Sequence, residues 1–234
     1  MDTDFNIRYA RNLQLPGFSE DTQMKLRDSD ILIVGAGALG SVVAMYVAAS
    51  GIGSVSLADF DTVDISNLQR QVFYGENNLG EQKTMILAEK IRGLNSGVQV
   101  NVINRFLTPS TIEHYCRNKN VIVECSDNPA TKEMVVNIGR KLNIPVVLGG
   151  VKEYSGQVMV FTEGSPDYSD IFPSPGCSSV LPCGSSGVFG PLPGIVGCMQ
   201  ASEVIKIAGG LPGVLFNTLL TFDITEMVFR KFKF

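Results

Sequence analysis

The 234-residue chain lacks both an excess of positive charge and any long apolar run. Its net charge is −4 at pH 7, so it has no global basic field to attract nucleic acid or a membrane surface. Residues 1–20 contain no apolar segment of the kind found in secretion signals, and no apolar run approaches the length of a bilayer span. We therefore expect a cytoplasmic protein that binds neither nucleic acid nor membranes.

Paired cysteines and clustered histidines are also missing from the chain. The five cysteines form no C-x-x-C pair, so the sequence predicts neither a zinc knuckle nor a redox dithiol. We expect them to be reduced thiols, most of them in the core. His114 is the only histidine, and its place on an expected short helix over 109–119 indicates a surface residue rather than a catalytic one.

A glycine-rich turn near residue 35 is the feature around which the chain is organised. Four apolar residues, 31–34, predict a strand buried on both faces, and an apolar run over 41–50 predicts a helix. Gly35, Gly37 and Gly40 lie between them in the G-x-G-x-x-G spacing. Such glycines permit a tight turn, the approach of a phosphate and close packing of the helix on the strand. The turn therefore predicts a nucleotide site, with a ligand-free turn as the alternative.

An acidic residue follows at the distance expected for ribose binding. The next predicted strand, 54–59, ends in Asp59, close to the spacing at which a carboxylate reaches the ribose hydroxyls in this kind of βαβ unit. Up to this residue an NAD-dependent oxidoreductase fits as well as any ATP-dependent enzyme.

Two cations beyond Asp59 favour a ligand with more phosphate charge than a dinucleotide. Arg70 ends the polar loop 61–71, and Lys83 lies in the first turn of a helix expected to begin near residue 79. The helix dipole disfavours a cation in that position unless an anion lies nearby. Together Arg70 and Lys83 indicate a nucleoside triphosphate.

A further carboxylate follows the predicted strand that begins at residue 121. Asp127 lies just beyond the carboxyl end of this strand, which places it in the same crevice as Gly37 and Asp59. One interpretation is a cap or Asx-turn for the helix expected to begin near Thr131. The other is a magnesium ligand beside the phosphates.

The second half of the chain changes character. A parallel strand is predicted at 144–148, followed by a tight exit at Gly149 and Gly150, and an antiparallel strand at 155–162. Residues 163–187 show no periodicity and are typical of a functional lid. An apolar helix over 189–208 and a hairpin of 217–222 with 224–234 complete the chain. The predicted fold is one α/β domain over 1–234, a Rossmann-like and mostly parallel sheet flanked by helices and extended by antiparallel strands, preceded by helical pieces in 1–29.

Several motifs in order along the chain resemble one family. They are Arg8-Tyr-Ala-Arg11, the glycine loop, Asp59-Phe-Asp61, Ser66-Asn-Leu-Gln-Arg-Gln71, Lys83, Ser126-Asp-Asn128 and the block over 187–197 with the helix that follows it. The chain resembles the E1-like adenylyltransferases that activate ubiquitin-like sulfur carrier proteins, the bacterial ThiF, MoeB and HesA group. The resemblance runs nearly from end to end.

The resemblance implies a role for each matching residue. Asp59 would bind the ribose of ATP, Asn67, Arg70 and Lys83 would hold the triphosphate, and Asp127 would hold Mg²⁺. The implied nucleotide-binding set is Gly35, Gly37, Ala38, Gly40, Asp59, Asp61, Ser66, Asn67, Arg70, Gln71, Lys83, Asp127 and Asn128. Arg11, Arg70, Lys83 and Asp127 would act in catalysis.

The resemblance also implies partners. Arg11 would reach the nucleotide site of a neighbouring subunit, which makes a homodimer the active unit. Residues 163–187 would form the crossover loop under which the Gly-Gly tail of the carrier passes, and Cys183 would be either an adduct site or an inert thiol. Sulfur would come from a separate donor protein. The zinc-binding cysteines of many members are absent, since the first position reads Tyr168-Ser-Asp-Ile-Phe-Pro173, so no zinc is expected.

The implied reaction is ATP-dependent adenylylation of the carrier's C-terminal glycine, for sulfur transfer in thiamin or molybdopterin synthesis. The carboxylate nucleophile is already ionised at neutral pH, so the step needs no general base and suits a chain with one histidine. Two alternatives remain open at this point. One is an NAD-dependent oxidoreductase, and the other is a catalytically silent E1-like scaffold.

Overall fold

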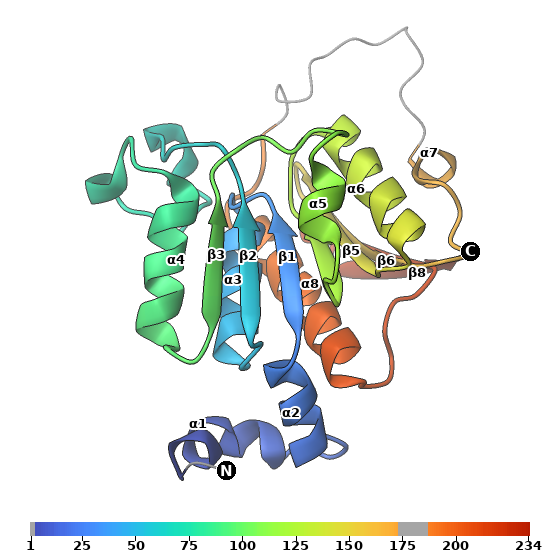
Figure 1. Ribbon diagram of the computed structural model, residues 1–234. Helices are drawn as coiled ribbons and strands as arrows, with labels where there is room; N and C mark the ends of the chain where they lie inside the picture. The colour runs from blue at the N-terminus through green and yellow to red at the C-terminus, as the bar shows by residue number, and fades with distance from the viewer. Residues whose placement is uncertain (1–2, 173–186) are drawn as a thin grey trace, which may run out of the picture.

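The computed structural model describes residues 3–172 and 187–234 (Figure 1). The helices within these ranges are α1 Thr3–Leu13, α2 Glu20–Arg27, α3 Gly40–Ala49, α4 Lys83–Leu94, α5 Ile112–Cys116, α6 Pro129–Leu142, α7 Tyr168–Ile171 and α8 Leu192–Gly209. The strands are β1 Asp30–Val34, β2 Ser54–Ala58, β3 Gln99–Ile103, β4 Val121–Glu124, β5 Val146–Lys152, β6 Ser155–Phe161, β7 Thr218–Asp223 and β8 Val228–Lys233. Short 3₁₀ helices occur at Ile65–Asn67 and Glu76–Asn78.

The described strands form one sheet in the order β3-β2-β1-β4-β5-β6-β7-β8. Neighbouring strands from β3 to β5 are parallel, and the pairs from β5 to β8 are antiparallel. This confirms the predicted parallel sheet with an antiparallel extension. The chain runs outward from β1 to β3 and then returns to β4, so the strand order reverses between β1 and β4. Ligands of doubly wound sheets bind at such a reversal, beyond the carboxyl ends of the strands.

Helices cover both faces of the parallel strands, which explains why β1 is apolar at successive positions. Ile31 and Ile33 join a core formed with α3, α4 and α8. Leu32 and Val34 point to the other face and pack with α5 and α6. Because side chains alternate along a strand, only a strand covered on both sides buries every residue.

The expected tight exit at Gly149 and Gly150 is wrong, because both glycines lie within β5. A Cβ on Gly149 would come within 2.4 Å of the Gln200 side chain, and one on Gly150 within 2.8 Å of Gln157 Nε2. The two glycines therefore provide room for neighbouring side chains rather than a turn. The helix expected to begin near residue 79 begins at Lys83.

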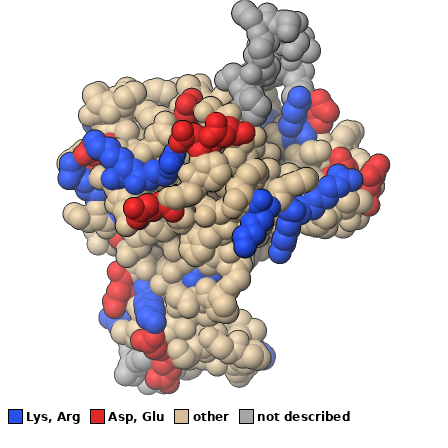
Figure 2. All heavy atoms as spheres, turned by 90° about the vertical axis from the view of Figure 1, so that its right-hand side faces the viewer, with Lys and Arg blue, Asp and Glu red and all other residues tan. Residues whose placement is uncertain are grey.

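The edge strand β8 is strongly basic. Arg230, Lys231 and Lys233 are all exposed on it, and Figure 2 shows Lys and Arg side chains gathered on the face where the sheet ends. Charged side chains on an edge strand oppose unwanted strand pairing. Among the described helices, none is long and apolar enough to cross a membrane.

Candidate active site

The glycine loop between β1 and α3 has little room for side chains. Gly35 has a φ of +95°, and a Cβ there would lie 2.9 Å from the backbone carbonyl of Cys125. A Cβ on Gly40 would lie 1.8 Å from the carbonyl oxygen of Gly35. Gly37 differs, since the nearest atom to its Cβ position is Gln71 Nε2 at 3.6 Å. Gly35 and Gly40 are therefore required by the fold, whereas packing does not require a glycine at position 37, which is partly exposed.

Asp59, which directly follows β2, is hydrogen-bonded to this loop. Its Oδ2 accepts a hydrogen bond from Ala36 N at 2.6 Å, and its Oδ1 accepts one from Asp61 N at 2.9 Å. Each carboxylate oxygen has a second lone pair that could accept a further hydrogen bond. The two hydrogen bonds hold the Asp59 carboxylate in one orientation. Ribose binding by this carboxylate stays a prediction.

Tyr74 holds the same loop from the other side, and sequence reasoning missed it. Its hydroxyl donates to Ala36 O at 2.6 Å. Burial, followed by the charge of Asp59, raises the pKa of Tyr74, so the hydroxyl keeps its proton and remains a donor at neutral pH. No local sequence pattern identifies such a contact, because it joins residues 38 positions apart.

The two predicted cations lie on adjoining elements. Lys83 begins α4, is only 4% exposed, and places its Nζ 3.1 Å from Asp61 Oδ2, whose side chain is 51% exposed. Arg70 is half-buried, and its Nη1 donates to Ser66 O at 3.0 Å. Arg70 forms no ion pair within residues 3–172 and 187–234. Its charge is therefore available to an anionic ligand.

Polar groups of the loop 61–71 form a hydrogen-bonded network next to Arg70. The Ser66 backbone N–H and hydroxyl donate to Asp64 at 2.8 and 2.6 Å, and Asn67 Nδ2 lies 3.4 Å from the Ser66 hydroxyl. Gln71 is buried, and its Oε1 has no hydrogen-bond partner in the described part of the chain. Since buried polar atoms are normally paired, Gln71 beside Gly37 is a further feature of a ligand site.

Asp127 and Asn128 have different functions in the structure. Asn128 is the N-cap of α6, with its Oδ1 accepting from Thr131 N at 3.1 Å. The capping interpretation considered for Asp127 therefore belongs to Asn128. Asp127 is exposed, and no hydrogen bond or ion pair engages its carboxylate among the described residues.

A single free carboxylate fits Mg²⁺ when phosphates are also present. The described residues contain no group of three or more His, Cys, Asp or Glu side chains arranged to hold a metal on their own. Mg²⁺ in nucleotide enzymes commonly takes one or two carboxylates, with substrate phosphates and water completing the shell. Asp127 matches that donor set.

Arg11 lies apart from the other predicted site residues of its own chain. It lies on α1 and donates to Gln14 Oε1 at 3.3 Å. Its neighbour Arg8 donates to Leu94 O at 3.0 Å, at the end of α4 opposite to Lys83. The 12-residue length of α4 corresponds to roughly 18 Å between those ends. Figure 1 likewise places α1 at the far end of the molecule from the carboxyl ends of β1 and β2.

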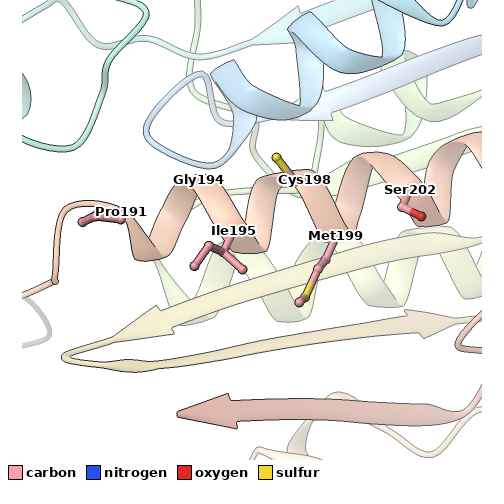
Figure 3. Close-up of a pocket in the computed structure, with 6 residues that line it drawn as sticks. All are labelled: Pro191, Gly194, Ile195, Cys198, Met199 and Ser202. Carbon is pink, nitrogen blue, oxygen red and sulfur yellow. The ribbon is translucent and has the colours of Figure 1, made fainter. Parts of the chain in front are cut away.

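Two of the described cysteines, Cys116 and Cys125, are buried thiols. Burial, with the charge of Glu124 adding to it, raises the pKa of the Cys125 thiol, and burial raises that of Cys116 to about 12. Cys198 is exposed and lines an apolar groove of about 480 Å³ along α8, with Pro191, Gly194, Ile195, Met199 and Ser202 (Figure 3). This groove contains none of the predicted nucleotide-binding residues. Cys183 and most of the predicted crossover loop lie outside the described residues.

The glycine loop, Asp59 and Asp127 follow the carboxyl ends of β1, β2 and β4 around the strand reversal, and the fold is that of a doubly wound α/β protein. The chain belongs to the ThiF family, which matches residues 9–234.

Two of the relatives that match this chain have the same name. The adenylyltransferase and sulfurtransferase MOCS3 of Caenorhabditis briggsae is 40% identical over 219 residues, covering 92% of this chain and 54% of that protein. The protein of the same name from Sus scrofa is 38% identical, covering 99% of this chain and 51% of its own length. The chain thus spans about half the length of the curated relatives it matches.

A solved structure agrees in fold. Escherichia coli MccB with ATP superposes with a TM-score of 0.82 at 23% identity, over 100% of this chain and 74% of that one. At that level of identity the likeness establishes the architecture alone, including the antiparallel extension of the sheet.

Proposed function

We propose that this chain is an adenylation domain that uses ATP to activate the C-terminal glycine carboxylate of a ubiquitin-like sulfur carrier protein, of the kind used in thiamin or molybdopterin synthesis. The observation that carries the proposal is a pair of cations that follow the glycine loop along the chain. Lys83 is buried at the start of α4, and Arg70 forms no ion pair among the described residues. This cationic charge exceeds what a dinucleotide needs. The relatives named adenylyltransferase and sulfurtransferase support the same reading.

In this reaction a carboxylate oxygen of the carrier bonds to the α-phosphorus of ATP. The bond from that phosphorus to the bridging oxygen breaks, and pyrophosphate leaves with the bonding electron pair. Lys83 and Arg70 stabilise the charge that develops on the leaving group, while backbone amides of the glycine loop orient the phosphates. Mg²⁺ held at Asp127 would neutralise further phosphate charge. No proton has to be removed from the nucleophile.

The proposal includes partners in addition to the nucleotide. The carrier's Gly-Gly tail would enter below the loop of residues 163–187, and Cys183 on that loop is a candidate site for a covalent adduct. A separate protein would donate sulfur, zinc would not be needed, and the reaction would take place in the cytoplasm. A homodimer is proposed because α1, which carries Arg11, lies at the far end of the molecule from the carboxyl ends of β1 and β2 (Figure 1).

The alternatives explain less of the geometry. A nicotinamide-dependent oxidoreductase uses a glycine loop and Asp59. It leaves without a role the buried Lys83 and Arg70, which forms no ion pair within the described part of the chain. A silent scaffold has no need of a glycine at position 37, where packing does not require one, or of an Asp127 carboxylate that has no partner among the described residues. Both alternatives predict that ATP is not consumed.

Mass spectrometry of the carrier tests the proposal. Incubation of the chain with Mg²⁺, ATP and a carrier ending in Gly-Gly is expected to add one AMP unit to the carrier. The matched control is the same carrier without its last glycine, which should gain no mass because its carboxylate no longer reaches the phosphate. Unchanged carrier mass across all candidate carriers, with ATP left intact, would overturn the proposal.

A further inference from the structure

A buried ion pair lies beneath the loop that carries Asp127. Glu124, the last residue of β4, is fully buried, and its Oε2 accepts from Lys132 Nζ on α6. Lys132 is 11% exposed and also donates to Gly149 O on β5 at 2.8 Å. The Lys132 ammonium therefore joins the carboxyl end of β4 to β5 and α6.

The same carboxylate holds the start of the Asp127 loop. Glu124 Oε1 accepts from Ser126 N at 2.9 Å and from the Ser126 hydroxyl. On the far side of Asp127, Asn128 is fixed as the N-cap of α6. Both neighbours of Asp127 are thus held, while its own carboxylate is exposed.

Stability alone is a weak reason for such a pair. Removing two charges from water costs several kcal/mol, and apolar residues of similar volume often serve a core as well or better. A buried ion pair is better explained where it fixes one geometry. Gln200 reinforces that geometry from the other face of the sheet, with Nε2 donating to Glu124 O at 2.9 Å.

We propose that Lys132 is a positioning residue, which holds Glu124 and Ser126 so that Asp127 faces the metal and phosphates of bound Mg-ATP. This inference rests on the proposed function, because it assigns Asp127 to the metal. Lys132 touches no nucleotide and acts only through the loop. Without the Lys132 ammonium, the buried Glu124 carboxylate loses its cation and is no longer held in one position. The Ser126 backbone that it fixes, and with it the backbone that carries Asp127, is then less well positioned.

Calorimetric titration with ATP, in Mg²⁺ and in a metal chelator, tests the assignment without an activity readout. Lys132→Met is expected to weaken Mg-ATP binding by about tenfold, the range seen when residues supporting a metal ligand are removed. Affinity for metal-free ATP should stay unchanged. The double variant with Asp127→Asn should bind Mg-ATP no more weakly than Asp127→Asn alone, because both changes act on one interaction.

Lys119→Met is the matched control. Lys119 is also 11% exposed, and its Nζ lies 2.7 Å from Asp30 Oδ2. Because Asp30 is the first residue of β1, this pair lies at the amino ends of the parallel strands, away from Asp127. Lys119→Met should therefore keep wild-type affinity for Mg-ATP. If Lys132→Met does not fold, Ser126→Ala removes one contact of Glu124 and should give the same metal-specific loss to a smaller degree.

Three results would overturn the assignment. The first is wild-type affinity for Mg-ATP in a folded Lys132→Met variant, the second is an equal loss of affinity for Mg-ATP and metal-free ATP, and the third is an additive effect in the double variant. If the wild-type chain binds ATP in neither condition, the proposed function itself is contradicted, and this assignment with it.

Discussion

Replacing Lys83 with methionine is expected to lower the rate of carrier-dependent ATP–pyrophosphate exchange by about a thousandfold, the upper end of the loss seen when one preorganised charge-stabilising donor is removed. Lys83 is 4% exposed, and its ammonium is held at the start of α4 by Asp61. Methionine keeps the apolar stem of the side chain but removes the charge. The chain should still fold, because Asp61 is 51% exposed and remains solvated without its partner.

Lys90→Met supplies the control for this prediction. Lys90 lies on the same helix α4 but is exposed, so the same substitution there should leave the exchange rate unchanged. A Lys83→Met variant that exchanges pyrophosphate at the wild-type rate would remove the main support for a triphosphate site.

Two inactive variants, Arg11→Ala and Arg70→Ala, are expected to recover activity when their subunits are mixed. Each alone should lose about a hundredfold in exchange rate, because each lacks one cation that stabilises the leaving pyrophosphate. Helix α1, which carries Arg11, lies at the far end of the molecule from the carboxyl ends of β1 and β2 (Figure 1), so in a symmetric dimer Arg11 would serve the partner's site. Random pairing makes half the dimers mixed, each with one intact site, so about a quarter of the wild-type rate should return.

Mixing Lys83→Met with Arg70→Ala is the control for subunit exchange. Both residues belong to the same chain's site, so every mixed dimer carries two damaged sites and no activity should return. The homodimer proposal fails if the Arg11→Ala and Arg70→Ala mixture stays inactive under conditions where the subunits demonstrably exchange, or if Arg11→Ala alone keeps the wild-type rate.

Local patterns in the sequence predicted the parallel half of the fold and the glycine loop. Residues 31–34 are apolar at every position because β1 is covered on both faces, and G-x-G-x-x-G spacing identifies the turn because Gly35 and Gly40 have no space for a side chain. Such signals arise from chain geometry over a few residues, which is why periodicity and spacing reveal them.

Contacts between distant residues could not be predicted in the same way. Neither the Tyr74 hydroxyl on the glycine loop nor Lys132 beneath Asp127 belongs to a local pattern, since each partner comes from a different element. The adjacent Gly149 and Gly150 resemble a turn in the sequence. Their actual role is to leave room for the side chains of Gln200 and Gln157, which lie elsewhere in the sequence. The single-domain boundaries and the nucleotide contacts stay predictions.

The central claim is tested most directly by ATP–pyrophosphate exchange with a panel of small ubiquitin-like carriers ending in Gly-Gly, each beside a control that lacks the tail. The account predicts exchange that requires one intact tail, because only a carboxylate placed at the α-phosphate completes the reversible step. No exchange with any carrier, together with no binding of ATP, would contradict it.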